Sequence, residues 1–124
     1  MSHPGADEDL IAAALETAEA IETYQAALGT SAVLLREMAV KLGAGESICE
    51  VMGSMSGAPS RVAAVRAEAD LKNARTLYRI ALVAACLAVG MQRKEIACKM
   101  GCSRQLVERY IKACLLYTSD AADE

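Results

Sequence analysis

The sequence predicts an all-α protein, and three observations support this. Of its 124 residues, 54% are apolar, but only 3% are aromatic, and both Trp and Phe are absent. Ala dominates the apolar fraction together with Leu, Val, Ile and Met, and an Ala/Leu-rich chain with few aromatics favours helix over sheet. Apolar residues also recur at alternating steps of three and four, which is the repeat of a helix that buries one face.

The first predicted helix covers residues 7–42. Asp7 and Asp9 suit the positive N-terminal end of a helix. Gly29 and Thr30 weaken the helix propensity without shifting the apolar repeat, so the segment is one long helix or two helices nearly in line. Residues 43–45 (GAG) end it. One heptad-like stripe, broken only by its glutamine, consists of Ile11, Ala14, Ala18, Ile21, Gln25, Leu28, Ala32, Leu35, Ala39 and Leu42.

A second long helix is predicted from residue 59 to about residue 89. A short helix at 46–52 and a loop at 53–59 (GSMSGAP) precede it. Its first half is charged, and its second half is apolar on nearly all sides, which indicates burial. Gly90 is the expected stop. We expect the long N-terminal helix to pack against this second long helix, with a C-terminal helix-turn-helix after them.

Charge is distributed unevenly along the chain. The formal net charge is −3. Residues 1–60 carry nine acidic and two basic side chains, whereas residues 61–113 carry eleven basic and four acidic ones. A basic segment behind an acidic one is typical of a protein in which one part meets a polyanion.

Residues 93–113 read RKEIACKMGCSRQLVERYIKA. Two helices that cross closely need a small residue at the crossing, which Ala97 supplies, and a residue that accepts a left-handed turn, which Gly101 supplies. Ser103 is placed to cap the second helix, and Glu95 could reach back toward Gln92 at the start of the first. The apolar residues that would form the small core around these points are Ile96, Met100, Cys102, Val107 and Tyr110.

This pattern resembles the helix-turn-helix of bacterial transcription regulators and the related units of sigma factors and site-specific recombinases. The resemblance covers about 21 of the 124 residues. The sequence departs from the family at Cys98 and Cys102, because Val or Ile is more usual directly after the turn glycine.

The resemblance implies that the second helix, from about Arg104 to Ala113, enters the major groove of DNA. The residues implied to contact base edges are Arg104, Gln105, Glu108 and Arg109. Those implied to contact phosphates are Arg93, Lys94, Lys99, Ser103 and Lys112. The alternative is that these side chains are simply the solvated charges of a surface helix.

Residues 114–124 (CLLYTSDAADE) resemble the translation of a sequencing adapter over their whole length. The resemblance implies that the natural reading frame ends near Ala113, so we set these residues aside as a non-native tail. The remaining expected regions are residues 1–58, for helix packing and dimerisation, and residues 59–113, for the second long helix and the DNA-binding unit.

The sequence offers no candidate active site, cofactor or metal. The only histidine, His3, lies in the polar N-terminus, and no Ser/His/Asp, Cys/His or glycine-rich phosphate pattern is present. A redox or metal switch at Cys98 and Cys102 is conceivable, but Cys102 occupies a core position and metal would need further ligands. With no signal peptide and no apolar run long enough to span a membrane, we expect a cytoplasmic protein with reduced thiols.

The expected function is therefore sequence-specific DNA binding that regulates transcription, with double-stranded DNA as partner and no enzymatic activity. Two alternatives stay open: the DNA-binding end of a truncated recombinase or transposase, and a helical protein-interaction module. We also expect a homodimer, because an Ala-rich core is only marginally stable and the second long helix can cover part of the stripe. In that dimer Gln25 could pair with its own copy and fix the register. The alternative is an intramolecular bundle that buries the whole stripe.

Overall fold

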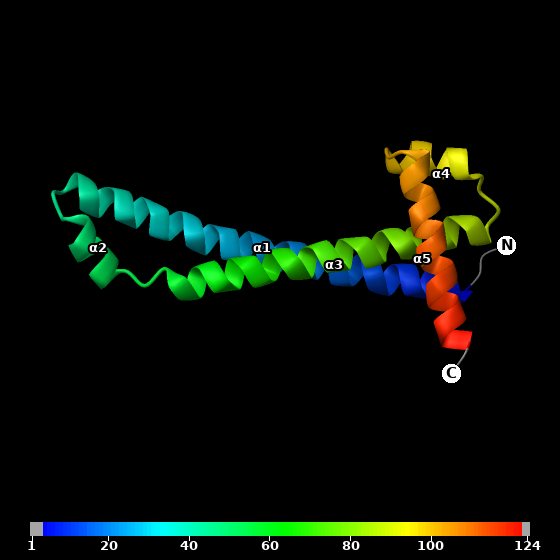
Figure 1. The fold of residues 1–124 in the computed structure, drawn as a ribbon, viewed down its shortest axis with the longest axis horizontal. Coiled ribbons are helices and arrows are strands. Elements are labelled where there is room, and N and C mark those ends of the chain that lie inside the picture. Colours follow the sequence, from blue (N-terminus) through cyan, green and yellow to red (C-terminus); the bar gives the residue numbers. More distant parts are fainter. Residues whose placement is uncertain (1–3, 123–124) are drawn as a thin grey trace. The chain divides into compact units, whose positions relative to one another are not determined.

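In the computed structural model, every element between Pro4 and Ala122 is an α-helix, which confirms the all-α prediction (Figure 1). The backbone is described for residues 4–122 and the side-chain surroundings for residues 5–115. The helices are α1 (Pro4–Gly43), α2 (Ile48–Ser54), α3 (Ala58–Ala88), α4 (Arg93–Met100) and α5 (Arg104–Ala122). The long helices α1 and α3 pack together, as expected.

The ends of the helices follow local signals in the sequence. Gly45, Gly90 and Gly101 are the glycines with positive φ in the described chain, and each follows the end of a helix. Gly29, in contrast, lies within α1, which runs through it as one continuous helix. Helix α2 begins later than expected because Ser47 caps it: the Ser47 hydroxyl accepts the N–H of Glu50 at 3.1 Å and donates to the Glu50 carboxylate.

The face of α1 that is covered is not the predicted stripe. The predicted stripe is exposed at every position except Ala32, which is half-buried. The covered face lies one residue away, about 100° around the helix. The residues along this face are buried or half-buried: Leu10, Ala13, Thr17, Ala20, Tyr24, Ala27, Ser31, Leu34, Met38 and Lys41.

Small and hydroxyl side chains explain why this face is chosen. The Thr17 hydroxyl lies 2.7 Å from the carbonyl oxygen of Ala13 and 3.2 Å from that of Ala74 in α3. The hydroxyls of Ser31 and Ser60 lie 3.3 Å apart. Such contacts require closely spaced backbones, which Ala, Ser and Thr permit and a row of leucines does not.

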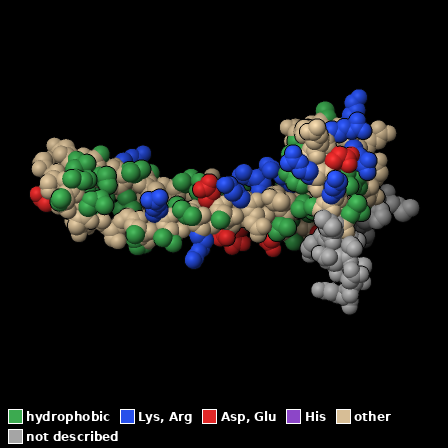
Figure 2. Space-filling model, viewed as in Figure 1, with side chains coloured by type: hydrophobic (Ala, Val, Ile, Leu, Met, Phe, Trp, Pro, Cys, Tyr) green, Lys and Arg blue, Asp and Glu red, His purple; other side chains and the backbone are tan. Residues whose placement is uncertain are grey.

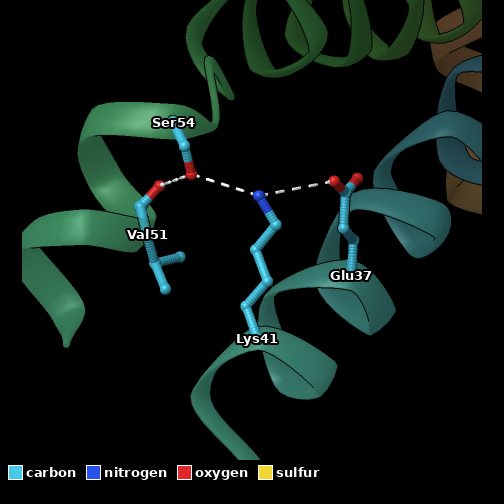
Figure 3. A network of polar contacts seen from close by, with 4 residues as sticks. All are labelled: Glu37, Lys41, Val51 and Ser54. Atoms are coloured by element: carbon cyan, nitrogen blue, oxygen red, sulfur yellow. Dashed lines mark hydrogen bonds and ion pairs between the residues drawn. The ribbon is translucent and has the colours of Figure 1, made fainter. Parts of the chain in front are cut away.

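The chain divides into two compact units. The first, Ala18–Lys72, holds most of α1, all of α2 and the first half of α3. Its fully buried side chain is Val51 of α2. Lys41 ties α2 to α1, because its ammonium donates to the Ser54 hydroxyl at 3.1 Å and lies 3.8 Å from the carboxylate of Glu37 (Figure 3).

The second unit combines the start of α1 with the end of α3, α4 and α5. Its core contains three fully buried side chains, Val83 of α3, Ile96 of α4 and Val107 of α5. The units do not coincide with the expected regions 1–58 and 59–113. Each unit contains part of α1 and part of α3, so the division falls within both long helices.

Helix α5 continues through Ala122, well past the expected end of the recognition helix at Ala113. The first residue of the presumed non-native tail, Cys114, is half-buried, and its thiol donates to the carbonyl oxygen of Ile80 at 3.3 Å. Leu115 is exposed, and the tail after it lies outside the residues whose side chains are described. The helix does not test where these residues come from, so the non-native origin of residues 114–124 stays a prediction.

Candidate nucleic-acid interface

Helices α4 and α5 are joined by a short turn with a left-handed residue at its start. Gly101 has φ 68° and ψ 34°. The N–H of Gly101 donates to the carbonyl oxygen of Cys98 at 3.2 Å, and the N–H of Cys102 donates to that of Ala97 at 3.1 Å. These two bonds form a Schellman motif, which satisfies carbonyl groups at the end of α4 and turns the chain sharply.

The start of α5 is fixed by a side-chain cap. The Ser103 hydroxyl accepts the N–H of Leu106 at 3.1 Å, as expected for the residue that precedes a helix. The side chain of Gln92, the N-cap residue of α4, makes no capping hydrogen bond. The expected contact of Glu95 with the start of this helix stays a prediction.

The residues expected to hold the two helices together lie in one cluster. Ile96, Ala97, Val107 and Tyr110 are buried in it, and Met100 and Cys102 are half-buried against it. Ala97 is the small residue of the group, so it lets α5 approach α4. The cluster also contains residues that the sequence analysis did not assign to this core: Val83 and Ile111 are buried in it, and the half-buried residues packed against it include Ile80, Cys86, Leu87, Met91 and Leu106. The 3.6-residue repeat of α5 could have identified Ile111, which follows Val107 by four residues.

The polar residues of α5 occupy the opposite face of the helix. Arg104, Gln105, Arg109 and Lys112 are exposed, and Glu108 is half-exposed. The residues expected at phosphates on the other elements, Arg93, Lys94, Lys99 and Ser103, are exposed as well. Lys and Arg side chains gather over α4 and α5 in the space-filling view (Figure 2).

Two of the predicted contact residues are engaged with each other. Nε of Arg93 lies 3.3 Å from the carboxylate of Glu108, which joins the start of α4 to the second turn of α5. Both side chains remain accessible, at 52% and 41%. The pair neutralises one acidic charge on an otherwise basic surface. It also restricts the orientation of the Glu108 side chain.

One thiol of this unit, that of Cys86, packs against its core. Cys86 is half-buried in the core, and its pKa is raised, first by burial and second by the carboxylate of Glu95. It is therefore a protonated thiol at neutral pH, with little nucleophilic character. Within the described residues, no group of three or more His, Cys, Asp or Glu side chains is placed to hold a metal ion.

No helix in the described part of the chain is long and apolar enough to cross a membrane. Comparisons with protein families, with characterised proteins and with solved structures found nothing similar to this chain.

Proposed function

We propose that α4 and α5 form a helix-turn-helix that binds double-stranded DNA sequence-specifically, and that the protein is a cytoplasmic regulator of transcription. The observation that carries the proposal is the turn at Gly101 together with the buried Ala97. It lets α4 and α5 cross closely and leaves one face of α5 exposed from its first residue. The N-terminal part of such a helix is the part that reaches base edges in the major groove.

The exposed residues of α5 have the chemistry that base edges require. The guanidinium groups of Arg104 and Arg109 can each donate two hydrogen bonds to O6 and N7 of guanine. Gln105 can donate to N7 of adenine and accept from its N6 amine. Glu108 can accept from the N4 amine of cytosine, although it must share its carboxylate with Arg93.

Phosphate contacts are assigned to the cations around this face. Lys94 and Lys99 of α4 and Lys112 of α5 are exposed and make no ion pair within the described residues. The Ser103 hydroxyl uses its oxygen to cap α5, and its proton is available to a phosphate oxygen. The first N–H groups of α5 add the positive end of a helix dipole. These contacts fix the position of the protein on DNA without reading its sequence.

Selection from a randomised duplex library, followed by fluorescence-anisotropy titrations, tests the proposal. We expect Arg104→Ala and Arg109→Ala to weaken binding to the selected sequence by about 1–3 kcal/mol each and to relax its sequence preference. Lys99→Ala should weaken all duplexes alike and reduce the dependence of affinity on salt. Arg66→Ala, which removes an exposed cation of α3 in the other unit, is the matched control and should leave binding unchanged.

The outcomes separate the alternatives. Binding that is equally insensitive to Arg104→Ala, Arg109→Ala and Arg66→Ala would remove α5 from the interface. A folded protein that binds no duplex at low salt would overturn the proposal and favour a protein-interaction module. We also propose that the regulator acts as a homodimer, because two copies double the number of base contacts and match a two-fold symmetric operator.

A further inference from the structure

The outer face of α1 within the Ala18–Lys72 unit is an apolar surface with no partner in the described chain. Its large side chains, Ile21, Leu28, Leu35 and Leu42, recur every seven residues and are 40%, 46%, 65% and 41% exposed. Together with the residues between them they keep the 3.5-residue average repeat of a coiled-coil seam. We call this surface, from Ala18 to Leu42, the outer seam. The α3 contacts lie on the neighbouring face, so α3 does not cover it.

We propose that the outer seam of α1 binds the outer seam of a second copy of this chain, with the two α1 helices antiparallel. The inference concerns a partner rather than DNA, and it does not depend on the proposed DNA binding.

The sizes of the side chains favour the antiparallel direction. Between its large residues the seam carries Ala18, Gln25, Ala32 and Ala39. When two copies run in opposite directions about a two-fold axis near Thr30, Leu28 faces Ala32 of the second copy and Leu35 faces Gln25. Every layer then places a large residue against a smaller one, the arrangement that fills a helix interface evenly. A parallel pair would instead stack Leu28 on Leu28 and Ala32 on Ala32.

The charges beside the seam favour the same direction. Glu22 and Arg36 each follow a large seam residue, so they lie along the same edge of the seam. Both are exposed, and neither makes an ion pair within the described part of the chain. On one straight helix they are about 21 Å apart and cannot meet. In the antiparallel pair Glu22 lies beside Arg36 of the second copy, and two-fold symmetry repeats the contact.

The size and charge of the outer seam favour a second copy of the chain over a lipid surface as its partner. They also indicate that the affinity is modest. The outer seam is about 36 Å long and about 10 Å wide, which gives a patch of roughly 360 Å². Patches of this size on a monomer often mark protein contacts, but a standard interface buries about 800 Å² on each partner. We therefore expect a dissociation constant on the order of micromolar. Glu22 flanks the seam and would repel anionic lipid headgroups.

Sedimentation of the full chain, without DNA, over about 1–200 μM tests the seam. We expect a reversible monomer–dimer equilibrium. Leu35→Glu should raise the dissociation constant at least tenfold while leaving the helical circular dichroism signal unchanged, because Leu35 is largely exposed in the monomer. Val33→Glu, which changes an equally exposed side chain outside the seam, is the matched control. A chain that stays monomeric over the whole range, or a dimer that tolerates Leu35→Glu as well as Val33→Glu, overturns the proposal.

Charge exchange and crosslinking test the direction. Glu22→Arg and Arg36→Glu should each weaken the dimer by about two- to fivefold, and the double exchange should restore it. In an Arg36→Lys variant, a carbodiimide should form an amide bond between Glu22 and position 36. Mixed ¹⁴N and ¹⁵N protein identifies that bond as one between two chains. Absence of this crosslink in a sample that is mostly dimer, or failure of the double exchange to rescue association, overturns the antiparallel arrangement.

Discussion

The two compact units differ in where their large apolar side chains lie. In the unit that contains α4 and α5, three helices each contribute a fully buried residue to one cluster: Val83, Ile96 and Val107. In the Ala18–Lys72 unit the fully buried residue is Val51, while Leu35, Val40, Ile48, Met52 and Val65 are all more than half exposed. The α4–α5 unit therefore has the more extensive core, whereas the Ala18–Lys72 unit exposes more large apolar side chains, the kind of surface that a protein partner covers.

This difference also separates what each unit can do. A fixed crossing of α4 and α5 needs a core that does not rearrange, because base contacts depend on side-chain positions held within fractions of an ångström. An extended helix face needs no such core, since it gains its burial from the partner. The proposed DNA contacts and the proposed self-association accordingly draw on different units, and variants in one unit can be used as controls for the other.

The largest expected effect compares the same substitution in the two units. Ile96→Ala removes a fully buried side chain and leaves a cavity, so it should lower the free energy of unfolding by about 2–5 kcal/mol. Ile48→Ala makes the same change at a residue of α2 that is 54% exposed. It should cost less than about 0.5 kcal/mol. Urea unfolding followed by circular dichroism measures both. Equal losses would mean that the two units do not differ in the way described.

Some elements of the fold could be predicted from the sequence and others could not. Gly90 and Gly101 adopt the left-handed turns and Ser103 forms the helix cap that the sequence predicts, because a turn or a cap depends on a few neighbouring residues. The exposed face of α5 also followed from its repeat. The expected start of α2, residue 46, is wrong, although the pattern Ser47-x-x-Glu50 indicates a helix capped by Ser47.

The covered face of α1 could not be chosen from periodicity, because two neighbouring faces carry the same alternation of three and four. Hydrophobicity favoured the leucine-bearing face. Close approach of α3 favoured the face with Ala20, Ala27 and Ser31 instead. The contact between Arg93 and Glu108 was likewise beyond the sequence, since it depends on how α4 and α5 cross in space.

The second effect concerns the crossing of α4 and α5. Ala97→Leu inserts a large side chain where the residue is buried in the cluster, and such overpacking should cost about 1–3 kcal/mol. Ala63→Leu makes the same change at an exposed position of α3 in the other unit and should be close to neutral. Thermal unfolding measures the two variants side by side. A neutral Ala97→Leu would show that the two helices are not held in close contact at this residue.

A smaller effect should have opposite signs in the two units. Gly101→Ala places a Cβ at a φ of 68°, which costs on the order of 1 kcal/mol, although no neighbouring atom crowds that position. Gly29→Ala removes a glycine from the middle of α1, where an added Cβ also meets open space, and should stabilise the protein by about 0.5–1 kcal/mol. Urea midpoints that shift in the same direction for both variants would contradict the assigned conformations.

The smallest expected effect concerns the ion pairs. Arg93–Glu108 joins two helices at 3.3 Å, and Glu37–Lys41 joins successive turns of α1 at 3.8 Å. Both are accessible to solvent, so a double-mutant cycle with Gln substitutions should assign each pair only about 0.2–0.5 kcal/mol of stability, falling further in high salt.

The two ion pairs should differ in their effect on DNA binding. Arg93→Gln removes a cation that the resemblance assigns to a phosphate contact, and it leaves the negative charge of Glu108 without its ion-pair partner on the proposed DNA-facing surface. Lys41→Gln changes a charge in the other unit. A titration of the selected duplex should therefore show weaker binding for Arg93→Gln and unchanged binding for Lys41→Gln. Equal affinity for both would place Arg93 and Glu108 outside the interface.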